Sequence, residues 1–174
     1  MPTLIVETGA GLSTSNSYAT AAEATTYFDN LSTATVWTSA TTEQKEKALR
    51  IATQWLDTSY GQDWIGQRSS SAQALDWPRD GAYDAAGELL EDVVPTRLKA
   101  ATAEVAVRYL QDATVLQPDI AAGEAGVLEE SVTVGPISTT TRFAGTKSPA
   151  AQFPKVSQLL TSAGLIATGG WARR

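Results

Sequence analysis

Apolar residues recur at helical spacing in two segments, and this periodicity constrains the fold most. The first stripe lies on one helical face and contains Ala48, Ile51, Ala52, Trp55, Leu56 and Tyr60. Thr41 and Gln44 form a capping-box pair ahead of it and Gly61 follows it, so we predict a helix between these residues. Pro95 suits the first turn of another helix. The stripe of that helix contains Leu98, Ala101, Thr102, Val105, Ala106, Tyr109 and Leu110.

Two shorter helices are predicted on either side of these. Thr20 and Glu23 form a capping box, which predicts a helix through about Asn30. A short helix is expected to start near Pro154. Residues 61–94 contain no long periodic run and many turn-forming residues, so they are expected to form a long structured loop.

Strand signals occur near the start of the chain and in its last third. Residues 4–6 are β-prone and predict one strand or an extended arm, which as an exposed edge would readily pair with another chain. Alternating residues on either side of Gly135-Pro136 predict a hairpin over about 128–143. The sequence therefore predicts a mainly α fold: a small helical bundle with an appended β-hairpin and extended N- and C-terminal arms.

Charge divides the chain by position. All nineteen acidic residues lie at or before Glu130, so residues 1–130 carry eight basic side chains and a net charge of −11. Residues 131–174 carry five basic side chains and no acidic one. We therefore expect an acidic helical domain over 1–130 and a basic hairpin, short helix and arm over 131–174, within one structural unit. Such a split favours a tail that docks on something acidic, although basic residues that merely fall late would give the same pattern.

Composition excludes several kinds of chemistry. The chain has no Cys and no His, which excludes disulfides, thiolate metal sites and imidazole acid–base catalysis. No apolar run approaches the roughly 20 residues that cross a bilayer, and residues 1–11 lack a signal-peptide pattern, so an intracellular origin without membrane contact is expected. We expect no enzymatic activity, no metal and no cofactor.

Three motifs have both a functional and a structural interpretation. Asp57, Asp63, Asp76, Asp80 and Asp84 could supply a carboxylate pair or a cation site, although acidic loop residues are usually solvated. The glycines at 9 and 11 resemble the start of a phosphate-binding loop, but no Lys-Ser/Thr pair follows. Among the five tryptophans, the one at 77, beside a proline, is expected to be a structural anchor, and the one at 171 an interface anchor or part of an unused tail.

Several segments together resemble a family of tailed-phage proteins. These segments are Leu4–Leu12, Asn16–Tyr18, Gln73–Arg79 with Gly81 and Gly87, Val94-Pro95, and Ser131–Ile137. They cover nearly the whole chain in order, and the central one, Gln-Ala-Leu-Asp-Trp-Pro-Arg, is the most specific. The family looks like head-tail connector, or adaptor, subunits, and such sequences are also labelled DnaT-like single-stranded-DNA-binding proteins.

The resemblance implies a virion protein of the neck, assembled in the host cytoplasm. Such subunits form a ring, commonly of twelve, beneath the portal. They contact the portal on one side and a head-tail stopper or tail-terminator protein on the other, and double-stranded DNA passes through without tight binding. An acidic body is compatible with such passage because it repels phosphate.

Candidate contact residues follow from this hypothesis. Those for the portal are Leu165, Ile166, Trp171, Arg173 and Arg174. Those for neighbouring subunits or for structural anchoring are Leu4, Ile5, Val6, Trp77, Pro78, Val132, Val134 and Ile137. The alternative function is single-stranded-DNA binding by the last 44 residues. In that case five cations neutralising phosphates would give a log-log salt slope of about −3.5.

Overall fold

A computed structural model describes residues 2–31, 35–116, 129–134, 137–142 and 153–167. The chain divides into two compact units, residues 1–113 with 153–174 and residues 114–152, which are described separately below. We call the described part of the first unit the body. The hairpin is the part of the second unit described at residues 129–134 and 137–142. The helix near Pro154 thus belongs to the body, although it follows the change of charge at Glu130. No helix within the described ranges is long and apolar enough to cross a membrane.

Five helices are described in the body, and four of them lie where the sequence predicts them. They are α1 (Ala21–Asp29), α2 (Thr35–Ser39), α3 (Thr42–Tyr60), α4 (Thr96–Gln111) and α5 (Pro154–Ser162). Both capping boxes are present: Thr20 with Glu23 begins α1, and Thr41 with Gln44 begins α3. Helix α2 was not predicted, because its five residues are too few to show a periodicity. The mainly α fold is confirmed.

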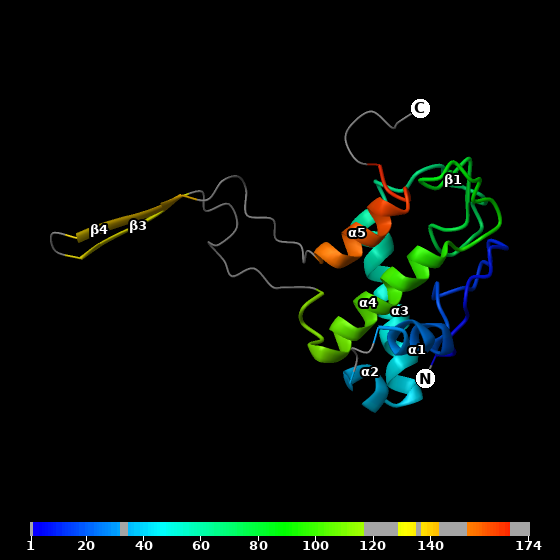
Figure 1. Cartoon of the computed structure of the whole chain (residues 1–174), viewed down its shortest axis with the longest axis horizontal. Coiled ribbons are helices and arrows are strands. Elements are labelled where there is room, and N and C mark those ends of the chain that lie inside the picture. Colours follow the sequence, from blue (N-terminus) through cyan, green and yellow to red (C-terminus); the bar gives the residue numbers. More distant parts are fainter. Residues whose placement is uncertain (1, 32–34, 117–128, 135–136, 143–152, 168–174) are drawn as a thin grey trace. The chain divides into compact units, whose positions relative to one another are not determined.

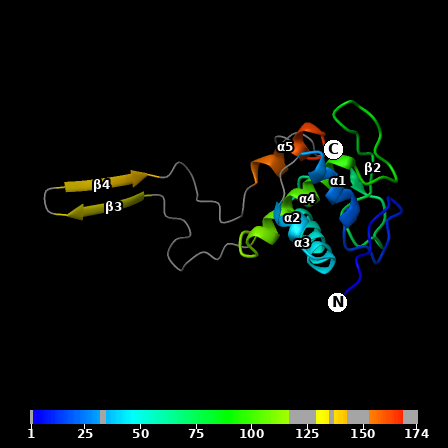
Figure 2. The same cartoon turned by 60° about the horizontal axis from the view of Figure 1, so that its bottom comes forward.

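Helix α4 is the centre of the body and packs against each of the other four helices. Figure 1 shows α4 beside α5, and in Figure 2 it lies between α3 and α5. Every residue from Ala100 to Val107 is buried, so α4 is covered all round and not only on the predicted stripe. Small side chains explain this, since alanines on every face let neighbouring helices approach closely.

The buried face of α3 differs slightly from the predicted stripe. Ala48, Ala52 and Leu56 are buried as predicted, but Leu49 and Thr53 are buried as well. The predicted stripe members Ile51, Trp55 and Tyr60 are half-buried. The last two belong to a row of contacting aromatic rings that runs from α5 to the central loop: Phe153, Trp55, Tyr60, Trp64 and Trp77.

Residues 61–94 form the predicted structured loop. It contains two short antiparallel strands, β1 (Gln67–Arg68) and β2 (Arg79–Asp80). The buried guanidinium of Arg79 donates hydrogen bonds to the carbonyl oxygens of Ile65 at 2.6 Å and Gly66 at 2.9 Å. Trp77, which is fully buried, packs edge-on against Trp64 with ring centroids 6.1 Å apart. Buried donors and rings therefore fix a segment without long helices.

The hairpin consists of β3 (Glu129–Val134) and β4 (Ile137–Arg142), close to the predicted range. The strands are antiparallel, with Val134 opposite Ile137 and Glu129 opposite Arg142. Because successive positions of a strand alternate between its two faces, the register gives the two faces different compositions. One face carries Glu130, Val132, Val134, Ile137, Thr139 and Thr141. The other carries Glu129, Ser131, Thr133, Ser138, Thr140 and Arg142.

Candidate functional site

A buried polar cluster joins the N-terminal segment, α3 and the central loop. The hydroxyl of Tyr18 donates to Oδ1 of Asp57 at 2.5 Å and accepts from the backbone N–H groups of Asp76 at 3.1 Å and Trp77 at 3.2 Å. The N–H of Asp76 also donates to Oδ2 of Asp57 at 3.3 Å. Burial raises the pKa of Asp57 to about 7, and the nearby charge of Asp76 adds to this against the opposing hydrogen bond from Tyr18. Two of the five candidate aspartates are thus brought together.

The other three candidate aspartates do not join this cluster. Asp63 and Asp80 are exposed, and Oδ1 of Asp84 accepts hydrogen bonds from the N–H groups of Ala86 and Glu88 at 2.8 and 2.9 Å. No group of three or more acidic side chains that could hold a metal ion occurs among the residues that the structure describes. The hydrogen bonds of Tyr18 themselves join the N-terminal segment, α3 and the central loop.

The glycines near the N-terminus bind a carboxylate of their own chain. Oε1 of Glu7 accepts from the N–H groups of Thr8, Gly9 and Gly11, each at 3.0 Å. Oε2 accepts from the N–H of Leu12 and the hydroxyl of Ser15, both at 2.9 Å. Glu7 is only 1% exposed. The N–H groups that resemble a phosphate loop are thus directed at Glu7, a residue that no sequence motif indicated.

The N-terminal segment is also tied to the body by its backbone. Val6 lies opposite Ser17 in a parallel bridge, and the N–H of Ile5 donates to the side chain of Asn16 at 2.9 Å. Of the three predicted contact residues, Leu4 and Val6 are half-buried and Ile5 is 37% exposed. This segment therefore pairs within its own chain. The expectation that its edge also joins another subunit stays a prediction.

Glu104 of α4 joins three helices at one buried point. It is 4% exposed and accepts hydrogen bonds from Tyr27 of α1 and Arg108 of α4, both at 2.8 Å. Lys155 of α5 forms an ion pair with it. Burial by itself would raise the pKa of Glu104, but the hydrogen bonds from Lys155, Arg108 and Tyr27 outweigh it and lower the pKa. Lys155 is one of the five basic side chains of residues 131–174, which we call the late cations, and this ion pair commits it to the body.

Other cations of the body also have intramolecular partners. Lys99 pairs with Glu23 at 2.7 Å, Lys45 lies 5.6 Å from the ring centroid of Trp37, and Arg79 is buried. Trp37, Trp64 and Trp77 are buried, which leaves them unavailable as stacking platforms. Single-stranded-DNA sites combine free cations with exposed aromatic rings. These three rings, and the cations Lys99 and Arg79, are therefore not available for such a site.

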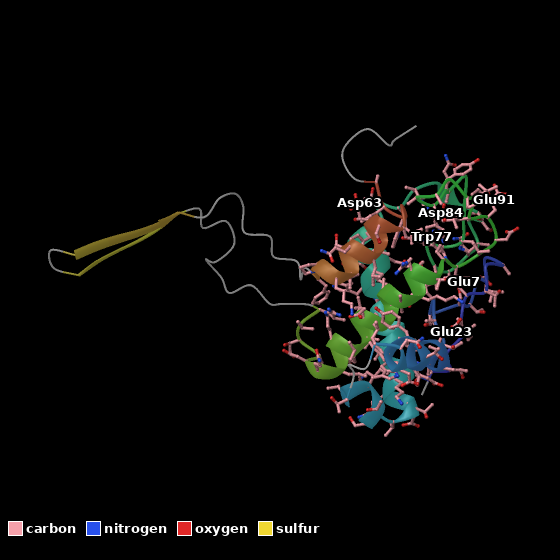
Figure 3. All side chains as sticks on the ribbon, viewed as in Figure 1. Glu7, Glu23, Asp63, Trp77, Asp84 and Glu91 are labelled. Atoms are coloured by element: carbon pink, nitrogen blue, oxygen red, sulfur yellow. The ribbon has the colours of Figure 1, made fainter. Side chains whose placement is uncertain are left out.

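An exposed acidic loop and an open hollow lie at one end of the body. The acidic loop is Asp80–Asp92, which contains five carboxylates and no Lys or Arg. Tyr83 and Leu89 lie opposite each other in an antiparallel bridge of this loop and are 55% and 46% exposed. The hollow, about 930 Å³, is lined by Trp64, Arg68, Asp80 and Tyr83 together with glycines 61, 66 and 81. Figure 3 shows Asp84 and Glu91 at this end of the body and Glu23 away from it.

The last described residues run along this end. The carbonyl of Ala163 accepts from the N–H of Ala85 at 3.1 Å, and the N–H of Ala167 donates to the carbonyl of Asp63 at 2.8 Å. Ile166 lies opposite Trp64 in an antiparallel bridge. Gly164 has a φ of +73°, and a Cβ there would lie 2.8 Å from the nitrogen of Ala85. The chain thus reaches residue 167 beside the hollow.

The predicted portal contacts occupy different environments. Leu165 is fully buried in the core and Ile166 is half-buried, so both hold residues 163–167 on the body. Trp171, Arg173 and Arg174 lie outside the described residues. For Val132, Val134 and Ile137 the backbone register places all three on one face of the hairpin. Trp77 and Pro78 are buried in the central loop, where Trp77 acts as an internal anchor.

Comparison with known proteins identifies one family. The model of the family described as "Putative DnaT-like ssDNA binding protein" matches residues 2–174, so the chain belongs to this family. No curated protein and no solved structure matches the chain. The match confirms the DnaT-like part of the resemblance seen in the sequence and contains nothing specific to a phage connector.

Proposed function

We propose that this member of the DnaT-like family is a structural assembly subunit, a head-tail connector that joins its neighbours through the hairpin. The hairpin register carries this proposal. It places Val132, Val134 and Ile137 on one face of a two-stranded ribbon. A two-stranded hairpin is marginally stable alone in water and gains stability when an apolar face is covered. A second copy is a suitable cover, because identical subunits repeat the same contact around a ring.

Charge supports the same proposal. The described body holds more acidic than basic residues, and Lys99 and Lys155 pair with carboxylates, so we expect it to repel phosphate. A ring of such bodies would let DNA slide through without retaining it. This proposal includes a ring of twelve subunits in the virion neck. The ring would contact the portal on one side and a stopper or tail-terminator protein on the other.

Paired substitutions on the two faces of one strand test the hairpin contact. Val132→Glu with Val134→Glu places charge at the apolar positions of the first face, and Ser131→Glu with Thr133→Glu adds the same charge to the other face. We expect the first pair to remove oligomers in sedimentation velocity, with or without portal protein, and the second pair to keep them. Equal loss in both variants, or equal retention, would contradict the proposal.

Removal of residues 168–174 tests the portal contact separately. The arm carries Trp171, Arg173 and Arg174, an aromatic and basic combination that is enriched where binding energy concentrates. We expect the shortened chain to stay folded, because the removed residues lie beyond Leu165, the last buried residue that the structure describes. We also expect it to lose its capture by immobilised portal protein. Unchanged capture would show that the arm is not the portal contact.

Single-stranded-DNA binding is the second candidate function, and the description of the family favours it. The cations available for it are fewer than the sequence suggests, because Lys155 pairs with buried Glu104. Four late cations then remain, and neutralising phosphates with all of them would give a log-log salt slope of about −2.8. We propose no catalytic role, since the Tyr18 cluster is fully used in holding the body together.

A further inference from the structure

We propose that in the free subunit the C-terminal arm, residues 168–174, binds to its own body, with Trp171 in the hollow and the two terminal arginines over the acidic loop. This inference goes beyond the proposed function, because it concerns the isolated chain and requires neither a ring nor a portal. It follows from where the described chain ends, from the charges that face each other and from the lining of the hollow.

The position of residue 167 places the arm within reach of both surfaces. The N–H of Ala167 is bonded to the carbonyl of Asp63, and its neighbour Ile166 lies opposite Trp64, which lines the hollow. An extended chain covers at most about 3.5 Å per residue, so Trp171 can lie up to roughly 14 Å from residue 167. The backbone contact between Ala163 and Ala85 brings the acidic loop to the same place.

The charges of the arm and of the acidic loop are complementary. The arm contains Arg173 and Arg174 and no acidic side chain, and the acidic loop contains five carboxylates without a cation. Glu88, Glu91 and Asp92 are exposed. Each such contact is weak on an exposed surface, but a short tether raises the effective concentration of the arm to about the millimolar range, which makes weak contacts sufficient.

The hollow offers contacts that suit a tryptophan. Tyr83 is 55% exposed at its edge, and the partly exposed guanidinium of Arg68 also lines it, so an indole ring could stack against either. The hollow is thus a better place for Trp171 than water.

This arrangement gives the acidic loop a regulatory role. An arm held on its own subunit is unavailable to unrelated acidic surfaces. A portal that presents more carboxylates, or a better pocket for Trp171, would compete the arm away. The exposed pair of Tyr83 and Leu89 would then become free for the next contact.

Disulfide trapping tests the inference, since the natural chain contains no Cys. One variant combines Ala172→Cys with Ala86→Cys, an exposed position on the acidic loop. The control combines Ala172→Cys with Thr161→Cys, an exposed position on α5 that is closer to the arm in sequence. An arm that does not bind the loop should reach position 161 at least as readily. We expect the 86–172 disulfide to form within one chain at least about tenfold faster.

Charge neutralisation supplies the second measurement. Glu88→Gln, Glu91→Gln and Asp92→Asn remove three carboxylates of the acidic loop, and Asp29→Asn with Glu43→Gln removes exposed carboxylates elsewhere. We expect the first set, or about 0.5 M salt, to slow the 86–172 reaction severalfold, and the second set to leave it unchanged. Three results would overturn the inference. The first is an 86–172 rate that is no higher than the 161–172 rate. The others are products that link two chains and an 86–172 rate that does not change with the charges of the acidic loop. None of these outcomes depends on portal binding.

Discussion

The hydroxyl of Tyr18 lies 2.5 Å from Oδ1 of Asp57, although 39 positions separate the two residues in sequence. Through the N–H groups of Asp76 and Trp77, the same hydroxyl also binds the central loop. One phenol thus fixes the N-terminal segment, α3 and the loop that carries the hollow. Its removal should loosen all three.

Tyr18→Phe removes the oxygen that makes these contacts and keeps the ring. Two backbone donors and the Asp57 carboxyl group lose a partner in a buried place, so we expect a loss of about 1–3 kcal/mol in the free energy of unfolding. Urea denaturation measures it. Tyr83→Phe is the matched control, and because Tyr83 is exposed it should change stability by no more than about 0.5 kcal/mol. Equal stability of both variants would mean that the Tyr18 cluster does not hold the body together.

Asp57 should make the body less stable as the pH rises. Its pKa is about 7 in the folded chain, against an ordinary value of 3.8. The folded state therefore binds the proton more tightly, and this stabilisation is fully present below about pH 4 and is lost as the pH rises through about 7. Urea denaturation at pH 5.5 and 8.5 should show lower stability at the higher pH.

Asp57→Asn is the control for this pH dependence. The amide does not titrate and can still accept the hydrogen bond from Tyr18, so the difference between pH 5.5 and 8.5 should shrink. Glu104 does not interfere, because its pKa is lowered and its stabilisation is lost only as the pH falls below its ordinary value of 4.5. An unchanged pH dependence in Asp57→Asn would assign the effect to another group.

Glu7→Gln should destabilise the N-terminal segment. One carboxylate accepts from the N–H groups of Thr8, Gly9, Gly11 and Leu12, and an amide would direct its own N–H₂ group at some of these donors. We expect a loss of about 1–3 kcal/mol in unfolding free energy and faster amide hydrogen exchange in this segment. Glu43→Gln, an exposed glutamate at the start of α3, should have little effect. Similar exchange in both variants would be incompatible with a structural carboxylate.

Lys155→Met tests whether the ion pair between Lys155 and Glu104 stabilises the packing of α5 on α4. The variant removes one partner of a carboxylate that is 4% exposed, while Arg108 and Tyr27 remain bonded to it. We expect a loss of about 1–3 kcal/mol, and a double-mutant cycle with Glu104→Gln should show coupling of about 0.5–3 kcal/mol. Strictly additive effects would mean that the two side chains do not interact in solution.

Much of the fold could be predicted from local patterns. Both capping boxes, the positions of four helices and the hairpin follow from signals within a few residues of each other. What the sequence could not show is pairing over long separations. Gly9 and Gly11 suggest an anion, but only the fold shows that Glu7 supplies it. Lys155 counts as a free cation until α5 is seen to pack against Glu104. Leu165 belongs to a tail in the sequence and to the core in the structure.

A titration of labelled single-stranded oligonucleotide against the intact chain tests the central claim most directly, namely that this protein is an assembly subunit and not a DNA binder. Fluorescence anisotropy would be recorded from about 50 mM salt upward, with sedimentation to give the oligomeric state. We predict no measurable binding even at about 50 mM salt. Tight binding by a monomer, with a log-log salt slope approaching about −2.8, would contradict the claim and establish DNA binding by the late cations.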